Sequence, residues 1–271
     1  MGTPAIACPA LEALLRDPSV SVVGVITQPI RPSGRGRRLV PSPVYQIATQ
    51  YQVPVWTPNR ASLLSVCEGS GATIIFVMAY GRLLPPDLLA MFPCVNAHAS
   101  LLPRYRGASP IQSALLNGDT QTGITYIQMT EGLDEGPMIA AYPIPIMPND
   151  HAGSLSNRLA QTVVDTLIPT LKGYLVNRNQ VTAQPVGATY CHKLTVGDRH
   201  LQPDGMSAVE MLNRIRAFSP DSGAFVMHLG RPVKILSATI ENGHLIPLRV
   251  RPDGKKTMSY RDYLLGNAPL F

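Results

Sequence analysis

Short, almost continuously apolar segments alternate with helical segments along the first 175 residues of this 271-residue chain. Residues 19–27, 72–78 and 94–98 are apolar and rich in β-branched side chains, which predicts buried strands. Between and around them, residues 9–16, 42–51, 85–91 and 109–116 place apolar side chains at helical spacing. Strands that are apolar on both faces need helices on both sides. The pattern therefore predicts an α/β fold, a doubly wound and mostly parallel sheet whose ligands bind at the carboxyl ends of the strands.

The sequence changes character after residue 177. Residues 178–189 are polar and contain glycine and proline, which indicates a linker. From residue 190 onward, a helix is predicted at 207–217, where Ser207 and Glu210 form a capping-box pattern. Three short strand candidates follow at 223–229, 233–239 and 244–250, and they favour a small β-barrel. We predict a catalytic domain at 1–177, a linker at 178–189 and a smaller OB-like domain at 190–271.

Charge and composition exclude several classes of protein. The net charge is +6, with +4 in residues 1–60, −2 in residues 61–189 and +4 in residues 190–271. Basic ends around a mildly acidic middle favour a polyanionic partner. No apolar stretch reaches the roughly 18 residues of a membrane span, and the four cysteines are too far apart for a zinc site or a disulfide framework. We expect a cytoplasmic monomer with free thiols, no membrane contact and no metal.

One polar stretch follows a predicted strand. Asn96 and His98 are two residues apart, so their side chains point to the same side of the strand, where the chain enters a loop. An amide and an imidazole in this arrangement can donate hydrogen bonds to an oxygen that acquires negative charge. Asp134 lies in the segment Gly132–Gly136, whose two glycines allow the carboxylate to turn toward His98. Each pattern alone is common as an ordinary strand end or turn, and only their combination indicates a reaction centre.

Taken together, these stretches resemble the folate-dependent formyltransferases, and most closely the branch that acts on methionyl-tRNA. The matching segments read NAHASLLP from Asn96, RGASPIQ from Arg106 and GLDEG from Gly132, together with MGTP at Met1 and RPSGRGRRL at Arg31. The likeness covers nearly the whole chain. It implies transfer of a formyl group from 10-formyltetrahydrofolate to the α-amino group of methionyl initiator tRNA. It also implies that Asn96 and protonated His98 stabilise the oxyanion, while Asp134 orients His98 and helps to remove the amine proton.

The resemblance also assigns binding residues. Those expected to line the folate pocket are Val77, Ala79, Tyr80, Gly81, Leu84, Ser100, Leu101, Leu102, Pro103, Gly132, Leu133 and Gly136. Those expected to bind tRNA are Arg31, Arg35, Arg37 and Arg38 in a Gly-rich loop, and Lys193, Lys255 and Lys256 in the C-terminal domain.

Members of this family usually have an apolar strand directly before the MGTP segment, so we expect the sheet to lack its first strand. Two other functions remain open: a formyltransferase for an amino sugar on a nucleotide carrier, and an RNA-binding relative with impaired catalysis. A nucleotide dehydrogenase is disfavoured because the chain has no GxGxxG motif between a strand and a helix.

Overall fold

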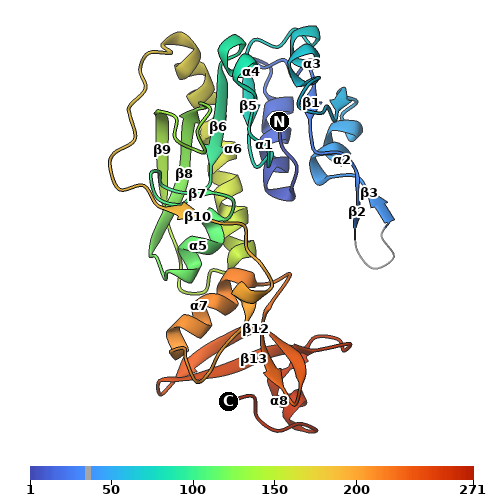
Figure 1. Ribbon diagram of the computed structural model, residues 1–271, viewed down its shortest axis with the longest axis vertical. Helices are drawn as coiled ribbons and strands as arrows, with labels where there is room; N and C mark the ends of the chain where they lie inside the picture. The colour runs from blue at the N-terminus through green and yellow to red at the C-terminus, as the bar shows by residue number, and fades with distance from the viewer. Residues whose placement is uncertain (34–37) are drawn as a thin grey trace. The chain divides into compact units, whose positions relative to one another are not determined.

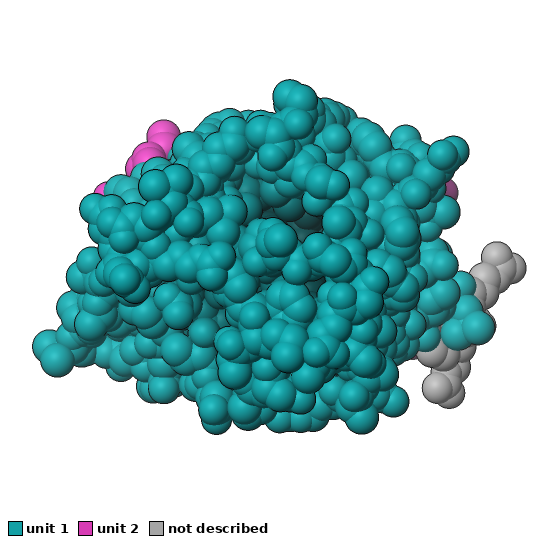
Figure 2. All heavy atoms as spheres, turned by 90° about the horizontal axis from the view of Figure 1, so that it is seen from above, with its two compact units in different colours: residues 1–107, 123–143, 157–190 teal, residues 108–122, 144–156, 191–271 magenta. Residues whose placement is uncertain are grey.

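The computed structural model describes residues 1–33 and 38–271, which form two compact units (Figures 1 and 2). Unit 1 comprises residues 1–107, 123–143 and 157–190, and unit 2 comprises residues 108–122, 144–156 and 191–271. The domain limits predicted from the sequence stay predictions. All four cysteines are free thiols.

The helices lie where apolar side chains recur at helical spacing. Their bounds are α1 Cys8–Arg16, α2 Pro43–Gln50, α3 Leu63–Gly69, α4 Pro86–Met91, α5 Pro110–Leu116, α6 Ala152–Val176, α7 Ala208–Phe218 and α8 Tyr260–Leu264. Proline stands near the start of α1, α2, α4 and α5, where its missing N–H has no helical partner to lose.

The strands vary in length from two residues in β1 to eleven in β12. Their bounds are β1 Val25–Ile26, β2 Arg31–Ser33, β3 Arg38–Val40, β4 Val55–Trp56, β5 Ile75–Val77, β6 Cys94–His98, β7 Arg106–Gly107, β8 Gln121–Gln128, β9 Met138–Pro145, β10 Tyr190–Cys191, β11 Ala224–His228, β12 Arg231–Glu241, β13 His244–Pro252 and β14 Met258–Ser259.

The main sheet of unit 1 has the order β5-β6-β8-β9. Strands β5 and β6 are parallel, β6 and β8 are antiparallel, and β1 pairs in parallel with β4. All five residues of β6 are buried, as expected for a strand covered on both faces. Helix α6 packs against β8, where the Tyr126 hydroxyl lies 3.0 Å from that of Thr166. The predicted α/β class with parallel strands is confirmed.

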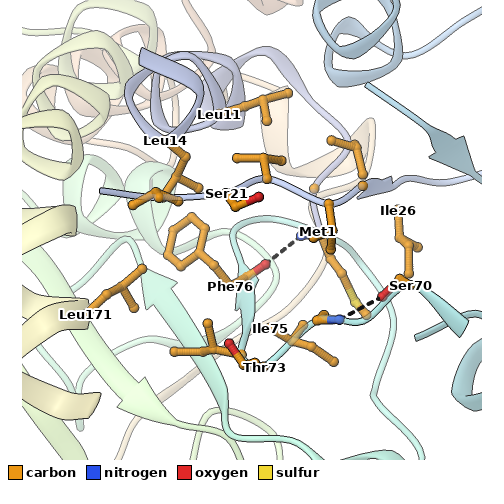
Figure 3. Close-up of a pocket in the computed structure, with 18 of the residues that line it drawn as sticks. Met1, Leu11, Leu14, Ser21, Ile26, Ser70, Thr73, Ile75, Phe76 and Leu171 are labelled. Atoms are coloured by element: carbon orange, nitrogen blue, oxygen red, sulfur yellow. Dashed lines mark hydrogen bonds between the residues drawn. The ribbon is translucent and has the colours of Figure 1, made fainter. Parts of the chain in front are cut away.

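A cavity lies between the β1-β4 sheet and the β5-β6-β8-β9 sheet of unit 1, because no full strand joins β1 to β5 among the described residues. Met1 and Gly2 bond to both sides: Gly2 N–H donates to Ile26 O at 3.1 Å, and Met78 N–H donates to Met1 O at 2.9 Å. The cavity has a volume of about 510 Å³ and is lined by apolar side chains that include Leu14 and Phe76 (Figure 3). This gap explains why the strand expected at 19–27 is regular only at Val25–Ile26. A hollow is visible in this unit in Figure 2.

The Met1 ammonium group lies at the edge of this cavity. It donates a hydrogen bond to Phe76 O (Figure 3). Burial lowers the pKa of this ammonium from 8.0 to about 6, because the charged form loses its hydration.

Unit 2 contains an open antiparallel sheet with the order β11-β12-β13-β14. Helix α7 covers its core, which includes Leu201, Met211, Ile215, Ile235 and Val250. The capping box predicted for α7 is confirmed, with Ser207 and Glu210 each bonded to the other's backbone N–H. In the part of the chain that is described, this sheet does not close into a barrel.

Candidate active site

Strand β6 positions the first two polar side chains of the site. Asn96 pairs with Val77 of β5 on one side and with Ile127 of β8 on the other, so its backbone is held by both neighbours. His98, two residues on, pairs with Thr125. Both side chains are buried, with exposed fractions of 8% for Asn96 and 6% for His98. The two-residue spacing brings them to the same side, as predicted.

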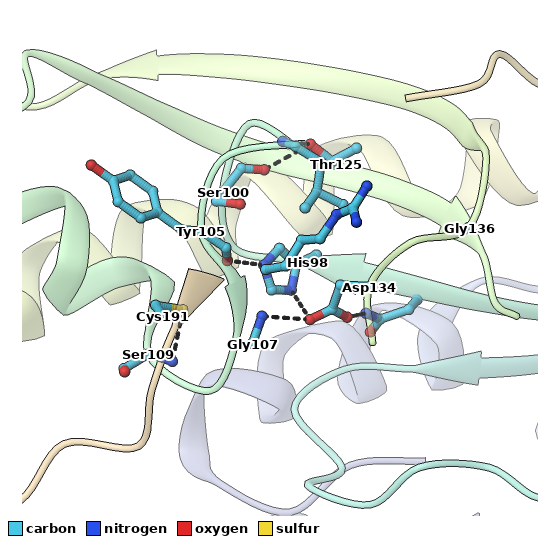
Figure 4. A network of polar contacts seen from close by, with 12 residues as sticks. His98, Ser100, Tyr105, Gly107, Ser109, Thr125, Asp134, Gly136 and Cys191 are labelled. Atoms are coloured by element: carbon cyan, nitrogen blue, oxygen red, sulfur yellow. Dashed lines mark hydrogen bonds and ion pairs between the residues drawn. The ribbon is translucent and has the colours of Figure 1, made fainter. Parts of the chain in front are cut away.

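Asp134 meets both side chains. Asn96 Nδ2 donates to Asp134 Oδ1 at 3.3 Å, and His98 Nδ1 lies 3.5 Å from Asp134 Oδ2. The backbone N–H of Gly107 also donates to Oδ2, at 2.8 Å (Figure 4). The amide, the imidazole and the carboxylate therefore form one hydrogen-bonded cluster, in which the carboxylate is 12% exposed.

The second ring nitrogen of His98 is also engaged. Nε2 lies 2.8 Å from the carbonyl oxygen of Tyr105 (Figure 4). A carbonyl can only accept, so Nε2 carries the proton of this bond. Both ring nitrogens thus face acceptors, an arrangement that a doubly protonated imidazole satisfies.

The loop after β6 is held by its own hydrogen bonds. Ser100 Oγ donates to Arg104 O at 2.6 Å, and Thr125 Oγ1 donates to Ser100 O at 2.7 Å. The N–H of Leu102 in turn donates to Thr125 Oγ1 at 3.1 Å. These bonds fix the chain between His98 and Tyr105, and with it the carbonyl that contacts the imidazole.

The residues predicted to line the folate pocket fall into two groups. Val77, Tyr80, Leu84, Ser100, Leu102, Pro103 and Gly136 are buried, and the first three of these belong to a core cluster. Solvent reaches the others, which are Ala79, Gly81, Leu101, Gly132 and Leu133. Ala79 and Gly81 both have positive φ, 50° and 77°, so the chain turns sharply just beyond β5. The accessible residues lie in three loops, which follow β5, follow β6 and join β8 to β9.

Comparison with known proteins identifies the family. The family described as Formyl transferase matches residues 2–171. The chain belongs to the formyl transferase family. It is 36% identical to the methionyl-tRNA formyltransferase of Synechocystis sp., with 98% of this chain and 96% of that protein aligned. It is 40% identical to the methionyl-tRNA formyltransferase of Halorhodospira halophila, over 98% of this chain and 94% of that one.

Solved structures share the fold of this formyl transferase. A methionyl-tRNA formyltransferase from Clostridium thermocellum aligns with a TM-score of 0.60 and 20% identity, over 74% of this chain and 86% of that one. An N-formyltransferase from Helicobacter canadensis, solved with folinic acid and dTDP-3-aminofucose, aligns with a TM-score of 0.69 and 19% identity, over 95% and 96%. Within residues 1–33 and 38–271, no helix has the length and apolarity of a membrane span, and no group of three or more His, Cys, Asp or Glu side chains could hold a metal ion.

The residues predicted to bind tRNA lie in both units of the formyl transferase. Arg35 and Arg37 fall outside the described residues. Arg31 and Arg38 belong to the backbone of the β2–β3 hairpin, where Arg31 pairs with Val40. Lys193, Lys255 and Lys256 are exposed in unit 2.

Sequence reasoning missed two groups of residues in this formyl transferase. The first comprises Gln184 and Thr189, which lie in the predicted linker but bond to the site: Tyr105 N–H donates to Thr189 Oγ1 at 2.9 Å, and Arg106 N–H donates to Thr189 O at 2.8 Å. The second is a pair of cations in unit 2, Lys234 on β12 and Arg251 directly opposite on β13. Burial, together with the charges of Arg251 and Arg199, lowers the pKa of Lys234.

Proposed function

We propose that this formyl transferase moves the formyl group of 10-formyltetrahydrofolate to the α-amino group of methionyl initiator tRNA. The observation that supports this proposal best is the cluster in which Asn96 Nδ2 and His98 Nδ1 lie 3.3 and 3.5 Å from the Asp134 carboxylate. The relatives that align over nearly the whole chain are methionyl-tRNA formyltransferases. The basic ends of the sequence suit a polyanionic acceptor.

In the proposed reaction, the amine nitrogen forms a bond to the formyl carbon, and the bond from that carbon to the folate nitrogen breaks. The formyl oxygen becomes negative as the amine adds. Asn96 Nδ2 has two hydrogens, and the one not directed at Asp134 can donate to this oxygen. The positive charge of protonated His98 stabilises the same oxygen. For a direct hydrogen bond to that oxygen, His98 Nε2 must first release the carbonyl oxygen of Tyr105.

Asp134 supplies the proton transfer. Its Oδ2 accepts from Gly107 N–H and contacts His98, which fixes the carboxylate beside the imidazole. The carboxylate takes the proton from the attacking amine, directly or through a water molecule, and a proton is returned to the departing folate nitrogen. No covalent bond to the protein is needed.

The cosubstrate and the tRNA bind through the residues named for them. For the folate, we propose the loops that contain Ala79, Gly81 and Leu133, because solvent reaches them. The first of these loops follows Val77, which pairs with Asn96, and the second contains Asp134. For the tRNA, we propose the arginine-rich hairpin of unit 1 and the lysines of unit 2, with Lys234 and Arg251 as additional contacts. We expect the enzyme to act as a monomer in the cytoplasm.

The test is a formyl-transfer assay with 10-formyltetrahydrofolate and methionyl initiator tRNA, using N96A, H98A and D134N. Each substitution should lower kcat by about 10² to 10³. The exposed Arg60→Gln serves as a control remote from the cluster in sequence and should leave kcat unchanged. Near-normal turnover by H98A would contradict the roles assigned here.

A competition assay separates the proposed acceptor from the alternatives. Charged initiator tRNA and a nucleotide-linked amino sugar are supplied together, and the formylated product is identified. Preference for the sugar would overturn the tRNA assignment while leaving the formyl chemistry intact. An RNA-binding relative without activity would bind tRNA but show no heat of binding with a folate analogue in calorimetry.

A further inference from the structure

Gln184 contacts the backbone of the Asp134 loop from 50 residues away. Its Nε2 donates to Asp134 O at 2.7 Å and to Gly136 O at 2.9 Å. An amide nitrogen has two hydrogens, so both are used on this loop. The two carbonyls lie on either side of Glu135, and a single side chain thus bridges the end of the segment that contains the carboxylate.

Arg106 determines which way the Gln184 amide faces. Its Nε and Nη2 donate to Gln184 Oε1 at 3.1 and 2.8 Å. A guanidinium can only donate, and therefore the amide oxygen must face it and the amide nitrogen must face the two carbonyls. Arg106 also pairs with Glu135, its Nη1 lying 3.3 Å from Glu135 Oε1. The same two-residue strand β7 supplies Gly107, whose N–H binds the Asp134 carboxylate.

The backbone of Asp134 needs such support. Its φ of 53° lies in the left-handed region, which is uncommon for a residue with a side chain. Conformations of this kind persist where the surrounding structure holds them. Rotation of this backbone would swing the carboxylate away from Asn96 and His98.

We propose that Gln184 is a positioning residue that holds the backbone of Asp134, and through it the carboxylate, at His98 and Asn96. This inference rests on the proposed function, because it takes Asp134 as the group that orients His98. Gln184 contacts neither substrate in this proposal. It acts through Asp134, with Arg106 fixing its orientation.

The activity test compares Q184A and Q184E with Q180A. Glutamate has the shape of glutamine and keeps a partner for Arg106, but a carboxylate has no hydrogens to donate to the two carbonyls. Both Gln184 variants should therefore lower kcat by about tenfold to a hundredfold, with KM values changed by less than about twofold. Gln180 is an exposed glutamine of the same segment, and Q180A should match the unaltered chain. Full activity in Q184E would show that Gln184 only fills space, and would overturn the proposal.

A double-mutant cycle with D134N distinguishes positioning from general stability. Once Asp134 has lost its charge, removing the residue that positions it should cause no further loss of activity. Q184A/D134N should therefore be as active as D134N within about twofold. Independent, multiplying losses would contradict an action through Asp134.

A spectroscopic measurement tests the inference without any turnover. In ¹⁵N NMR spectra of the full chain, the ring nitrogen signals of His98 should move in Q184A and Q184E toward their positions in D134N. They should stay in place in Q180A. If the unaltered chain transfers no formyl group, the proposed function fails, yet these spectra still test the positioning role. His98 signals in Q184A that coincide with those of the unaltered chain would overturn it.

Discussion

Gly136 lies so close to Gln128 that a Cβ atom on the glycine would be 1.8 Å from the Gln128 carbonyl oxygen. This oxygen belongs to the backbone and cannot move aside, whereas the end of a flexible side chain could. Only glycine therefore fits at the end of the Asp134 loop, two residues after the carboxylate and at one of the carbonyls that Gln184 binds.

Gly136→Ala should displace this loop. We expect a loss of about 1 to 3 kcal/mol in the free energy of unfolding, from forced backbone movement, and a loss of activity larger than that of Q184A. Urea unfolding and the formyl-transfer assay measure the two effects. Gly173→Ala in α6 is the matched control, because its Cβ meets nothing within 4 Å and should stabilise the chain slightly. An active, stable G136A protein would show that the loop tolerates displacement.

The cavity between β1 and β5 predicts that an added strand stabilises unit 1. Five apolar residues placed before Met1 would continue the parallel pairing that Met1 and Gly2 begin. Burying two or more of their side chains should raise the free energy of unfolding by about 3 kcal/mol or more. A Gly/Ser extension of the same length is the control. Equal urea midpoints for the two extensions would exclude the cavity as a place for a strand.

The Met1 ammonium predicts a pH dependence of stability. Its pKa is about 6 in the folded chain and near 8.0 in the unfolded chain, so between these values the unfolded chain binds more protons. Stability should rise as the pH increases from 6 to 8, by on the order of 2 kcal/mol, and should fall again as the pH is lowered. Urea midpoints across this window measure it. Acetylation of the terminus removes this titration but leaves the histidines, and an unchanged pH profile after acetylation would contradict the assignment.

Substituting Lys234, which lies opposite Arg251, should increase stability and weaken tRNA binding. Like charges directly opposite on antiparallel strands repel, so K234Q should raise the free energy of unfolding by about 0.2 to 1 kcal/mol. If this surface binds phosphates, the same change should weaken tRNA binding and reduce its salt dependence by about one counterion. Binding titrations at several salt concentrations test this. Unchanged affinity would remove Lys234 from the tRNA surface.

Much of this structure can be predicted from local patterns. Asn96 and His98 share a side because strand geometry repeats every two residues, and the α7 cap follows from two residues three positions apart. Gln184 and Thr189 could not be found in this way. Their partners are backbone groups far away in sequence, and a polar segment with glycine and proline looks like a linker whether or not its side chains are bonded. Strand β1 is shorter than its composition suggests, because β-branched residues form a regular ladder only where a neighbouring strand is present.

One continuous stretch of chain thus contacts the surroundings of both the imidazole and the carboxylate. Thr189 binds the backbone of Tyr105, whose carbonyl meets the imidazole, while Gln184, five residues earlier, binds the backbone of the carboxylate. Because both contacts belong to the same few residues, a sequence change in that stretch reaches the surroundings of the imidazole and of the carboxylate together.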